Sequence, residues 1–239
     1  MSVGVAFEGS AHHAGGVLFE KVALTMKPGQ WTCLLGASGV GKTTILRMIA
    51  GLDTGAELDG RIAALDDQPL ERRIAYMAQE DLLLPWATVR ENVMLGARLR
   101  AERADTVRAE RLLQDVGLGS HVDKKPHALS GGQRQRVALA RTLMEDREII
   151  LLDEPFSALD ARTRAEMQEL AFGLLAGRTV LLVTHDPGEA TRLGHAILIL
   201  TQNGLTELPA PASAPPRAVD DIETLAAQAA LLKRLRDAP

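Results

Sequence analysis

A nine-residue stretch, Gly-Ala-Ser-Gly-Val-Gly-Lys-Thr-Thr at positions 36–44, constrains this chain more than any other segment. It matches the phosphate-binding loop pattern G-x-x-x-x-G-K-[ST] at every defined position, and its glycines let backbone N–H groups point at a phosphate. Lys42 supplies a positive charge for the β- and γ-phosphates, and the Thr43 hydroxyl is suited to ligating Mg²⁺. The predicted nucleotide-binding residues of the loop are Gly36, Ala37, Ser38, Gly39, Val40, Gly41, Lys42, Thr43 and Thr44.

The flanking residues agree with this prediction. Residues 31–35 (Trp-Thr-Cys-Leu-Leu) predict a buried strand, and apolar residues at helical spacing follow the loop until Gly51. A helix that begins at the loop would add its N-terminal amides to the phosphate site. The alternative is a glycine-rich turn that matches the pattern by chance.

Composition excludes several classes of protein. With 239 residues, 46% of them hydrophobic, the chain is long enough for one large domain or two lobes with a shared core. The net charge of −4, without any block of lysines or arginines, argues against nucleic-acid binding. No apolar run is long enough to cross a bilayer, and the N-terminus lacks a basic and apolar leader, so a cytoplasmic location is expected.

The single cysteine, Cys33, lies in the strand predicted before the phosphate loop. A small buried apolar residue is expected there in preference to a reactive thiol. One cysteine permits no internal disulfide, which is consistent with a reducing compartment.

The hydrophobic pattern predicts an α/β domain over residues 1–208, with two additions to its core. Alternating apolar residues near the N-terminus predict antiparallel strands, and Asp59-Gly60 predicts a turn. Helical spacing over about residues 85–144 predicts an inserted helical subdomain, and Asn203-Gly204 predicts a tight hairpin turn.

The end of the chain has a different composition. Residues 209–217 are rich in proline and predict a stiff linker, whereas residues 218–239 predict an amphipathic helix. Two interpretations of this helix stay open: it packs back on the domain, or it binds a partner.

Two further motifs carry chemistry. Asp153-Glu154 follows an apolar strand, where the first carboxylate can ligate Mg²⁺ and the second can reach an attacking water, unless both are simply solvated. Residues 129–133 (Leu-Ser-Gly-Gly-Gln) predict a helix from about residue 133 with Ser130 as its N-cap. Gly131 and Gly132 would leave its amides bare as a second anion site, unless this is only a capped surface helix.

With these motifs in this order, the chain resembles the ATPase subunit of an ABC transporter from about residue 3 to residue 208. The motifs that carry the resemblance are the phosphate loop at 36–43, Gln79 of the Q-loop, the signature at 129–133, Ile-Leu-Leu-Asp-Glu-Pro at 150–155, the D-loop at 157–160 and the switch histidine His185. The resemblance implies a RecA-like phosphate-loop NTPase core with a mainly parallel sheet. An N-terminal antiparallel β subdomain and an inserted α-helical subdomain complete the expected fold.

The family resemblance also implies roles for residues and a homodimer around two Mg-ATP. Glu154 would polarise the water, and His185 would contact the γ-phosphate. The signature residues Ser130, Gly132 and Gln133 would act on the nucleotide held by the other subunit, so that two chains pair head to tail. The residues that would hold phosphate and Mg²⁺ are Lys42, Thr43, Gln79 and Asp153, of which the last three are the expected metal site.

One segment departs from the family. Its members usually stack an aromatic residue on adenine about two dozen residues before the phosphate loop, and this chain has His12 and His13 in that region. His13, or less readily His12, would stack on the base, although two loop histidines without a role are the alternative. A metal site at this pair lacks a third ligand nearby in sequence.

Residues 82–93, just after Gln79, resemble the importers of the nitrate, sulfonate and taurine group, which includes carriers of hydroxymethylpyrimidine-like thiamine precursors. This segment is expected to contact a transmembrane permease, with Pro85 and Trp86 either at that contact or as a packing anchor. The subunit would lie on the cytoplasmic face of the inner membrane, and a solute-binding protein would deliver the solute.

Two competing classes of phosphate-loop protein remain. An ABC ATPase that acts in DNA repair or translation without a permease usually carries coiled-coil inserts or two cassettes, and neither is present here. A lone phosphate-loop kinase would have no use for the motif at residues 129–133.

Overall fold

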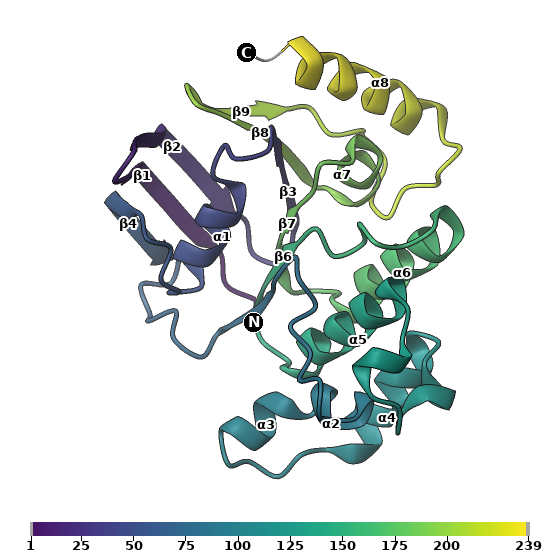
Figure 1. Ribbon diagram of the computed structural model, residues 1–239. Helices are drawn as coiled ribbons and strands as arrows, with labels where there is room; N and C mark the ends of the chain where they lie inside the picture. The colour runs from purple at the N-terminus through teal and green to yellow at the C-terminus, as the bar shows by residue number, and fades with distance from the viewer. Residues whose placement is uncertain (1, 238–239) are drawn as a thin grey trace. The chain divides into compact units, whose positions relative to one another are not determined.

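The computed structural model describes residues 2–237, which form two compact units (Figure 1). The first unit contains the chain up to Tyr76, the segment Glu148–Asp153 and the chain from Gly177 onward. The second contains Met77–Arg147 and Glu154–Ala176. Among the described residues, no helix is both long and apolar enough to span a membrane.

The first unit is built on a six-stranded sheet with the strand order β5-β6-β7-β3-β8-β9. Strand β3 pairs in parallel with β7 and β8, whereas β9 is antiparallel to β8. The continuous apolar sequences of β6 and β7 are buried along their whole length, as expected for parallel strands covered on both faces. The strand bounds are β3 (Trp31–Gly36), β5 (Ile74–Met77), β6 (Ile149–Asp153), β7 (Thr179–Val183), β8 (Ala196–Thr201) and β9 (Gly204–Leu208).

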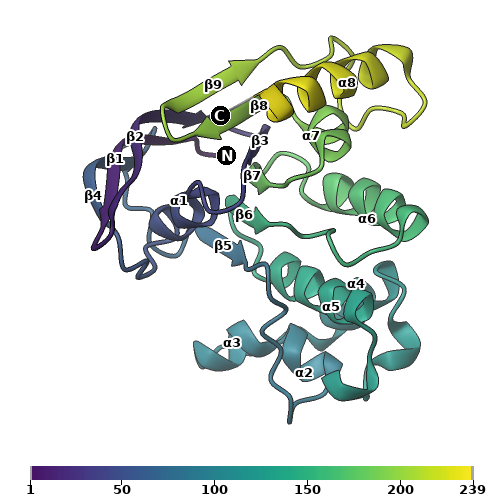
Figure 2. The ribbon, with the colours of Figure 1, turned by 45° about the horizontal axis from the view of Figure 1, so that its top comes forward.

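A second, antiparallel sheet has the order β2-β1-β4, formed by β1 (Val5–His13), β2 (Gly16–Met26) and β4 (Glu57–Ala64). Helix α1 (Lys42–Ile49) lies between this sheet and the larger one (Figure 2). Side chains from both sheets and from α1 form one hydrophobic cluster, in which Phe7 and Phe19 are fully buried with ring centroids 6.1 Å apart. This cluster fixes the helix that begins at the phosphate loop.

Two turn predictions need correction. Asp59-Gly60 is not a turn, because β4 continues through it and Gly60 pairs with Gly9 of β1. The strands approach so closely there that a Cβ at Gly60 would overlap the Glu8 carbonyl oxygen, so glycine serves a close approach of backbones. The hairpin between β8 and β9 exists, but its two-residue loop is Gln202-Asn203, one position earlier than predicted.

The second unit is mainly helical. Its longest helices, α5 and α6, have 14 residues each, and α5 packs against α2 and α4. Thr88 and Glu91 form a capping box at the start of α2, with each side chain bonded to the other residue's backbone N–H. The helix bounds are α2 (Val89–Val93), α3 (Leu95–Leu99), α4 (Thr106–Asp115), α5 (Gly131–Met144) and α6 (Ala161–Leu174).

The chain ends with α8 (Ile222–Asp237), which contacts α7 (Pro187–Leu193) within the first unit. Leu231 of α8 is buried, so the helix packs back on its own unit. The segment 209–221 contains neither helix nor strand, and the predicted helical residues 238 and 239 lie outside the described residues. Cys33 is fully buried in β3, as expected.

Candidate nucleotide-binding site

The phosphate loop connects β3 to α1 in the first unit. Its backbone passes close to β8, because a Cβ at Gly36 would overlap the Leu200 carbonyl oxygen. The N-cap of α1 is Gly41, and neither a capping side chain nor an acidic residue occupies the first turn. The helix therefore begins without an internal negative group, which suits an anion at its N-terminus.

Lys42 is held against this loop. Its Nζ donates hydrogen bonds to the carbonyl oxygens of Gly36 and Ala37, both at 2.8 Å, and the side chain is buried. Thr43, the next residue of α1, is exposed. The loop and the start of α1 thus carry the Lys42 ammonium group and the exposed Thr43 hydroxyl group, the pair expected for a triphosphate with Mg²⁺.

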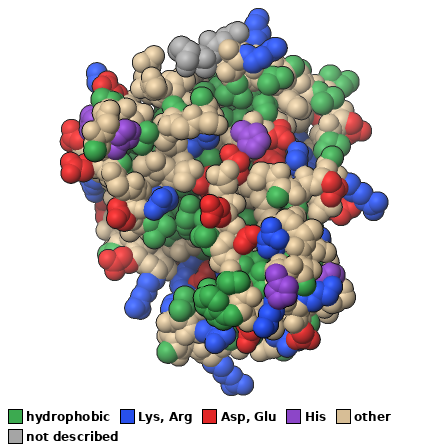
Figure 3. All heavy atoms as spheres, in the orientation of Figure 1, with side chains coloured by type: hydrophobic (Ala, Val, Ile, Leu, Met, Phe, Trp, Pro, Cys, Tyr) green, Lys and Arg blue, Asp and Glu red, His purple; other side chains and the backbone are tan. Residues whose placement is uncertain are grey.

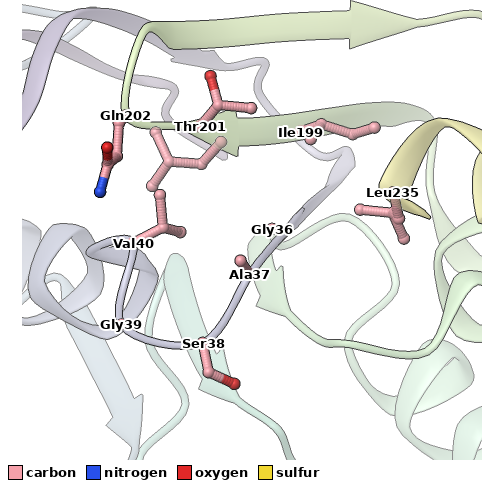
Figure 4. Close-up of a pocket in the computed structure, with 10 residues that line it drawn as sticks. Gly36, Ala37, Ser38, Gly39, Val40, Ile199, Thr201, Gln202 and Leu235 are labelled. Carbon is pink, nitrogen blue, oxygen red and sulfur yellow. The ribbon is translucent and has the colours of Figure 1, made fainter. Parts of the chain in front are cut away.

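A cavity of about 260 Å³ lies beside the phosphate loop (Figure 4). Val40 lines it from the loop, Ile199 and Thr201 from β8, and Leu235 from the last turn of α8. The C-terminal helix therefore reaches the neighbourhood of the predicted nucleotide site.

Asp153 is the last residue of β6, and it is only 1% exposed. Tyr76 of β5 lies beside it: burial, followed by the charge of Asp153 and a side-chain hydrogen bond to it, raises the pKa of Tyr76 to about 12. A buried carboxylate at the carboxyl end of a central strand fits the expected Mg²⁺ ligand.

His185 follows β7 and is exposed. The loop that carries it is fixed at Thr184, whose Oγ1 donates to Glu189 Oε2 at 2.6 Å and accepts from Asp186 N at 3.0 Å. Thr184 and Glu189 are both buried, so this charge-assisted bond ties the His185 loop to α7.

In the second unit, Gln79 and Glu154 lie together. Gln79 Nε2 donates to Glu154 Oε2 at 3.2 Å, and Glu154 has a φ of 49°, an uncommon conformation for a residue other than glycine. Buried Gln135 of α5 supports it, because its Nε2 donates to the Glu154 carbonyl oxygen at 2.9 Å and to Ser157 Oγ at 3.2 Å. Its Oε1 also accepts from Ala158 N at 2.9 Å.

The signature motif begins α5. Ser130 is the N-cap as predicted and forms a capping box with Gln133, with bonds of 2.9 Å and 3.2 Å. The helix starts at Gly131, two residues earlier than predicted. Gly132 faces residues 158–159 so closely that a Cβ would lie 3.1 Å from the Ala158 carbonyl oxygen. The glycine therefore permits a close approach of backbone to backbone.

The segment after Gln79 is tied to α5. Arg134 Nε donates to Asp81 Oδ2 at 2.9 Å, and Arg141 donates to the carbonyl oxygens of Asp81 and Leu82 at 2.7 and 2.8 Å. Trp86 is 70% exposed, so it is not a packing anchor. A cavity of about 410 Å³ lies between this segment, the start of α5 and residues 157–158.

Buried Asn92 holds the loop that carries Trp86. Its Nδ2 donates to the carbonyl oxygens of Leu84, Ala87 and Thr88, and its Oδ1 accepts from Leu84 N at 2.7 Å. Because one side chain bonds backbone groups at residues 84, 87 and 88, the loop keeps a defined shape although Trp86 is exposed.

His12 and His13 are exposed at the end of β1, and His13 Nδ1 accepts a hydrogen bond from Gly15 N at 2.9 Å. Adenine stacking by His13 stays a prediction. Within residues 2–237, no group of three or more histidine, cysteine or acidic side chains is arranged to hold a metal ion.

Sequence reasoning missed Gln135 and Asn92, and it wrongly predicted a capping box of Asp186 with Glu189: Asp186 alone caps α7, whereas Glu189 Oε2 accepts from Thr184 Oγ1. Gln135, Asn92 and Glu189 are all buried polar residues, and the side chain of each forms a hydrogen bond to a residue of a functional loop 4 to 23 positions away in the sequence. A polar residue on the otherwise buried face of a predicted helix, as at Gln135, is the one signal that was present in the sequence.

Residues 19–157 match the ABC transporter family. The chain belongs to this family. Its members hydrolyse ATP with Mg²⁺, and this chain is accordingly an ABC ATPase subunit.

Several relatives are similar over most of their length. An uncharacterized ABC transporter ATP-binding protein of Haemophilus influenzae is 45% identical, with 92% of this chain and 93% of the relative covered. The aliphatic sulfonates import ATP-binding protein SsuB 1 of Rhodococcus jostii is 46% identical, with 85% and 82% covered. The dimeric structure of MJ0796, a bacterial ABC transporter cassette, superimposes with a TM-score of 0.75 at 29% identity, covering 90% of this chain and 99% of that one.

Proposed function

We propose that this chain is the ATPase subunit of an importer for aliphatic sulfonates. The observation that carries the proposal is the 46% identity to the Rhodococcus jostii protein, whose name assigns it to aliphatic sulfonate import. Relatives with the same kind of name in Agrobacterium fabrum and Delftia acidovorans, 44% and 40% identical, support it further. A nitrate-, taurine- or hydroxymethylpyrimidine-like solute is the alternative within the same group.

Within one chain, we assign the roles that the resemblance to the family implies. Lys42 holds the β- and γ-phosphates, and Thr43, Gln79 and Asp153 hold Mg²⁺, which supplies charge neutralisation for phosphoryl transfer when bound. Buried Asp153 and uncapped α1 support these assignments.

Glu154 is the general base, and His185 contacts the γ-phosphate. The Gln79 amide, 3.2 Å from the Glu154 carboxylate, holds that carboxylate in place, and Gln135 holds its backbone. The strained φ of Glu154 supports a functional role, because such a conformation persists only where its surroundings enforce it.

Two chains pair so that Ser130, Gly131, Gly132 and Gln133 of one face the nucleotide held by the other. The dimeric cassette structure of the 29% identical relative supports pairing. The capping box at Ser130 supports the presentation of a rigid helix end.

The segment of residues 82–93 binds a transmembrane permease, so that this subunit lies on the cytoplasmic face of the inner membrane. The exposed side chains of Leu82 and Trp86, of which Leu82 lines the cavity of about 410 Å³, support a docking role for the segment. Bonds from Arg134 and Arg141 to residues 81–82 connect it to the signature helix, so permease contact and nucleotide contact share one rigid element. A solute-binding protein delivers the sulfonate to the permease.

Uptake of a labelled alkanesulfonate tests the proposed function in cells that lack the gene for this chain. The wild-type chain should restore uptake. Glu154→Gln should not restore it, because loss of the base lowers turnover by about 10²–10⁴ while ATP binding persists.

Nitrate, taurine and hydroxymethylpyrimidine serve as solute controls in the same cells. If deletion abolishes uptake of one of these and leaves alkanesulfonate uptake intact, the sulfonate assignment is wrong. If Glu154→Gln restores uptake fully, Glu154 is not the base.

A further inference from the structure

Helix α8 has a second apolar face in addition to the one that packs on α7. Ile222 is 84% exposed, Leu225 47% and Leu232 46%, and Ala229 is exposed between them. The spacings of 3, 4 and 3 residues place these side chains on one stripe. The opposite face, with Thr224 and Leu231 buried, belongs to the unit's own packing.

The charges of α8 are separated along its axis. Asp220 is exposed just before its start, and Lys233 and Arg236 are exposed near its end, on or beside the apolar stripe. Glu223 and Arg234 are turned away from the stripe, and Glu223 Oε1 accepts a hydrogen bond from Ala212 N at 2.8 Å. Figure 3 shows basic side chains beside the end of this helix and hydrophobic ones over its surface. The helix dipole alone favours this order of charges, but it gives no reason for an exposed apolar stripe between them.

We propose that this outer face of α8 binds the same face of a second copy of the chain, with the two helices antiparallel. In that arrangement, the acidic start of each helix lies against the basic end of the other, and the contact is isologous. A parallel arrangement would bring like charges together. Ala229 near the middle of the stripe lets the two helices approach closely.

The base of α8 is rigid enough to present this face. Buried Arg217, just before the helix, donates to the carbonyl oxygens of Thr191 and Gly194 at 2.7 and 2.9 Å. It also donates to those of Pro211 and Ser213 at 2.8 and 2.7 Å, so the linker is fastened to α7 and its surroundings. Binding of the second copy therefore costs little conformational entropy in the linker and in α8.

The contact is small. A helix of 16 residues is about 24 Å long, and one helix pair buries less than a standard interface of about 1,600 Å². It is therefore weak alone, and it strengthens any other contact between the same two copies by raising their effective concentration. The contact does not require nucleotide, which separates it from the proposed nucleotide sandwich.

Cysteine cross-linking of the full chain without nucleotide tests the contact. Ala229→Cys places a thiol on the stripe, and the matched control Ala230→Cys places one at the next exposed position, about 100° away around the helix. The native Cys33 does not form cross-links, because it is buried and burial raises the pKa of its thiol. Ala229→Cys should form disulfide-linked dimers at least about tenfold faster than the control, since a disulfide requires close Cα atoms.

Charge reversal tests the antiparallel direction in the Ala229→Cys background. Lys233→Glu with Arg236→Glu should slow cross-linking, and adding Asp220→Lys to the same chain should restore it. The proposal is wrong if the two cysteine positions cross-link at equal rates. It is also wrong if the combined reversal fails to restore the cross-linking rate in chains whose thermal stability is unchanged. Neither result bears on the proposed nucleotide sites shared by two chains, because those sites are tested by ATP hydrolysis.

Discussion

Two adjacent glycines of the signature helix differ in what surrounds them. A Cβ at Gly131 would find its nearest neighbour at 3.9 Å, on Arg134, whereas a Cβ at Gly132 would lie 3.1 Å from a backbone oxygen and 3.2 Å from Leu159. A flexible side chain can move away, but a backbone oxygen cannot do so cheaply. The two positions therefore form a matched pair for testing the close approach.

Gly131→Ala should raise the free energy of unfolding by up to about 1 kcal/mol, because alanine favours the helix. Gly132→Ala should lower it by about 1–3 kcal/mol through overpacking. Urea denaturation of both variants measures the difference. Equal effects at the two positions would show that residues 158–159 do not constrain the helix start.

At this scale, sequence alone predicted those residues whose chemistry follows from their immediate neighbours. Lys42 bonds the Gly36 carbonyl oxygen six residues earlier in the loop, and Ser130 caps α5 through a bond to the backbone N–H of Gln133, three residues later. Gln135 was missed, because its partners at 154–158 lie about 20 residues away and only folding brings them together.

At the scale of elements, β8 is fastened to its surroundings through His195. Trp31 N donates to His195 Nδ1 at 3.0 Å. Burial and the nearby charge of Arg217 lower the pKa of His195 below its ordinary value of 6.5. The unfolded chain therefore takes up this proton at a higher pH than the folded chain does, and stability falls as the pH falls through that range.

His195→Asn should reduce this pH dependence. Asparagine Oδ1 can accept the Trp31 hydrogen bond but does not titrate. The urea midpoint of the wild-type chain should drop between about pH 7.5 and pH 5.5 by more than that of the variant. The same drop in both chains would exclude His195 as the cause, because carboxylates with lowered pKa values, such as Asp66 and Asp221, act only at more acidic pH.

Elements with a clear hydrophobic pattern were predicted well from the sequence. The prediction failed where one residue type, glycine, has two structural uses. The apolar strand β6 before Asp153-Glu154 and the helix α5 after Ser130 follow directly from their patterns. Gly60 failed as a turn signal, because glycine serves both positive φ angles and close backbone contacts. Which use applies depends on β1, about 50 residues earlier.

On the scale of the whole molecule, the nucleotide motifs are divided between the two units. Lys42, Asp153 and His185 belong to the first, whereas Glu154 and Ser130 belong to the second. The family membership explains why all of them occur in one chain. We propose that a complete site takes its phosphate loop from one chain and its signature from another.

Mixing two inactive variants tests this claim most directly. Lys42→Ala removes the phosphate-loop charge, and Ser130→Arg blocks the signature, so each variant alone should be inactive. Random pairing of an equal mixture makes half of the dimers mixed, each with one intact site, so ATP hydrolysis should return to about a quarter of the wild-type rate. If mixed dimers form but hydrolyse no more ATP than either variant alone, the two motifs act within one chain and the nucleotide site is not shared.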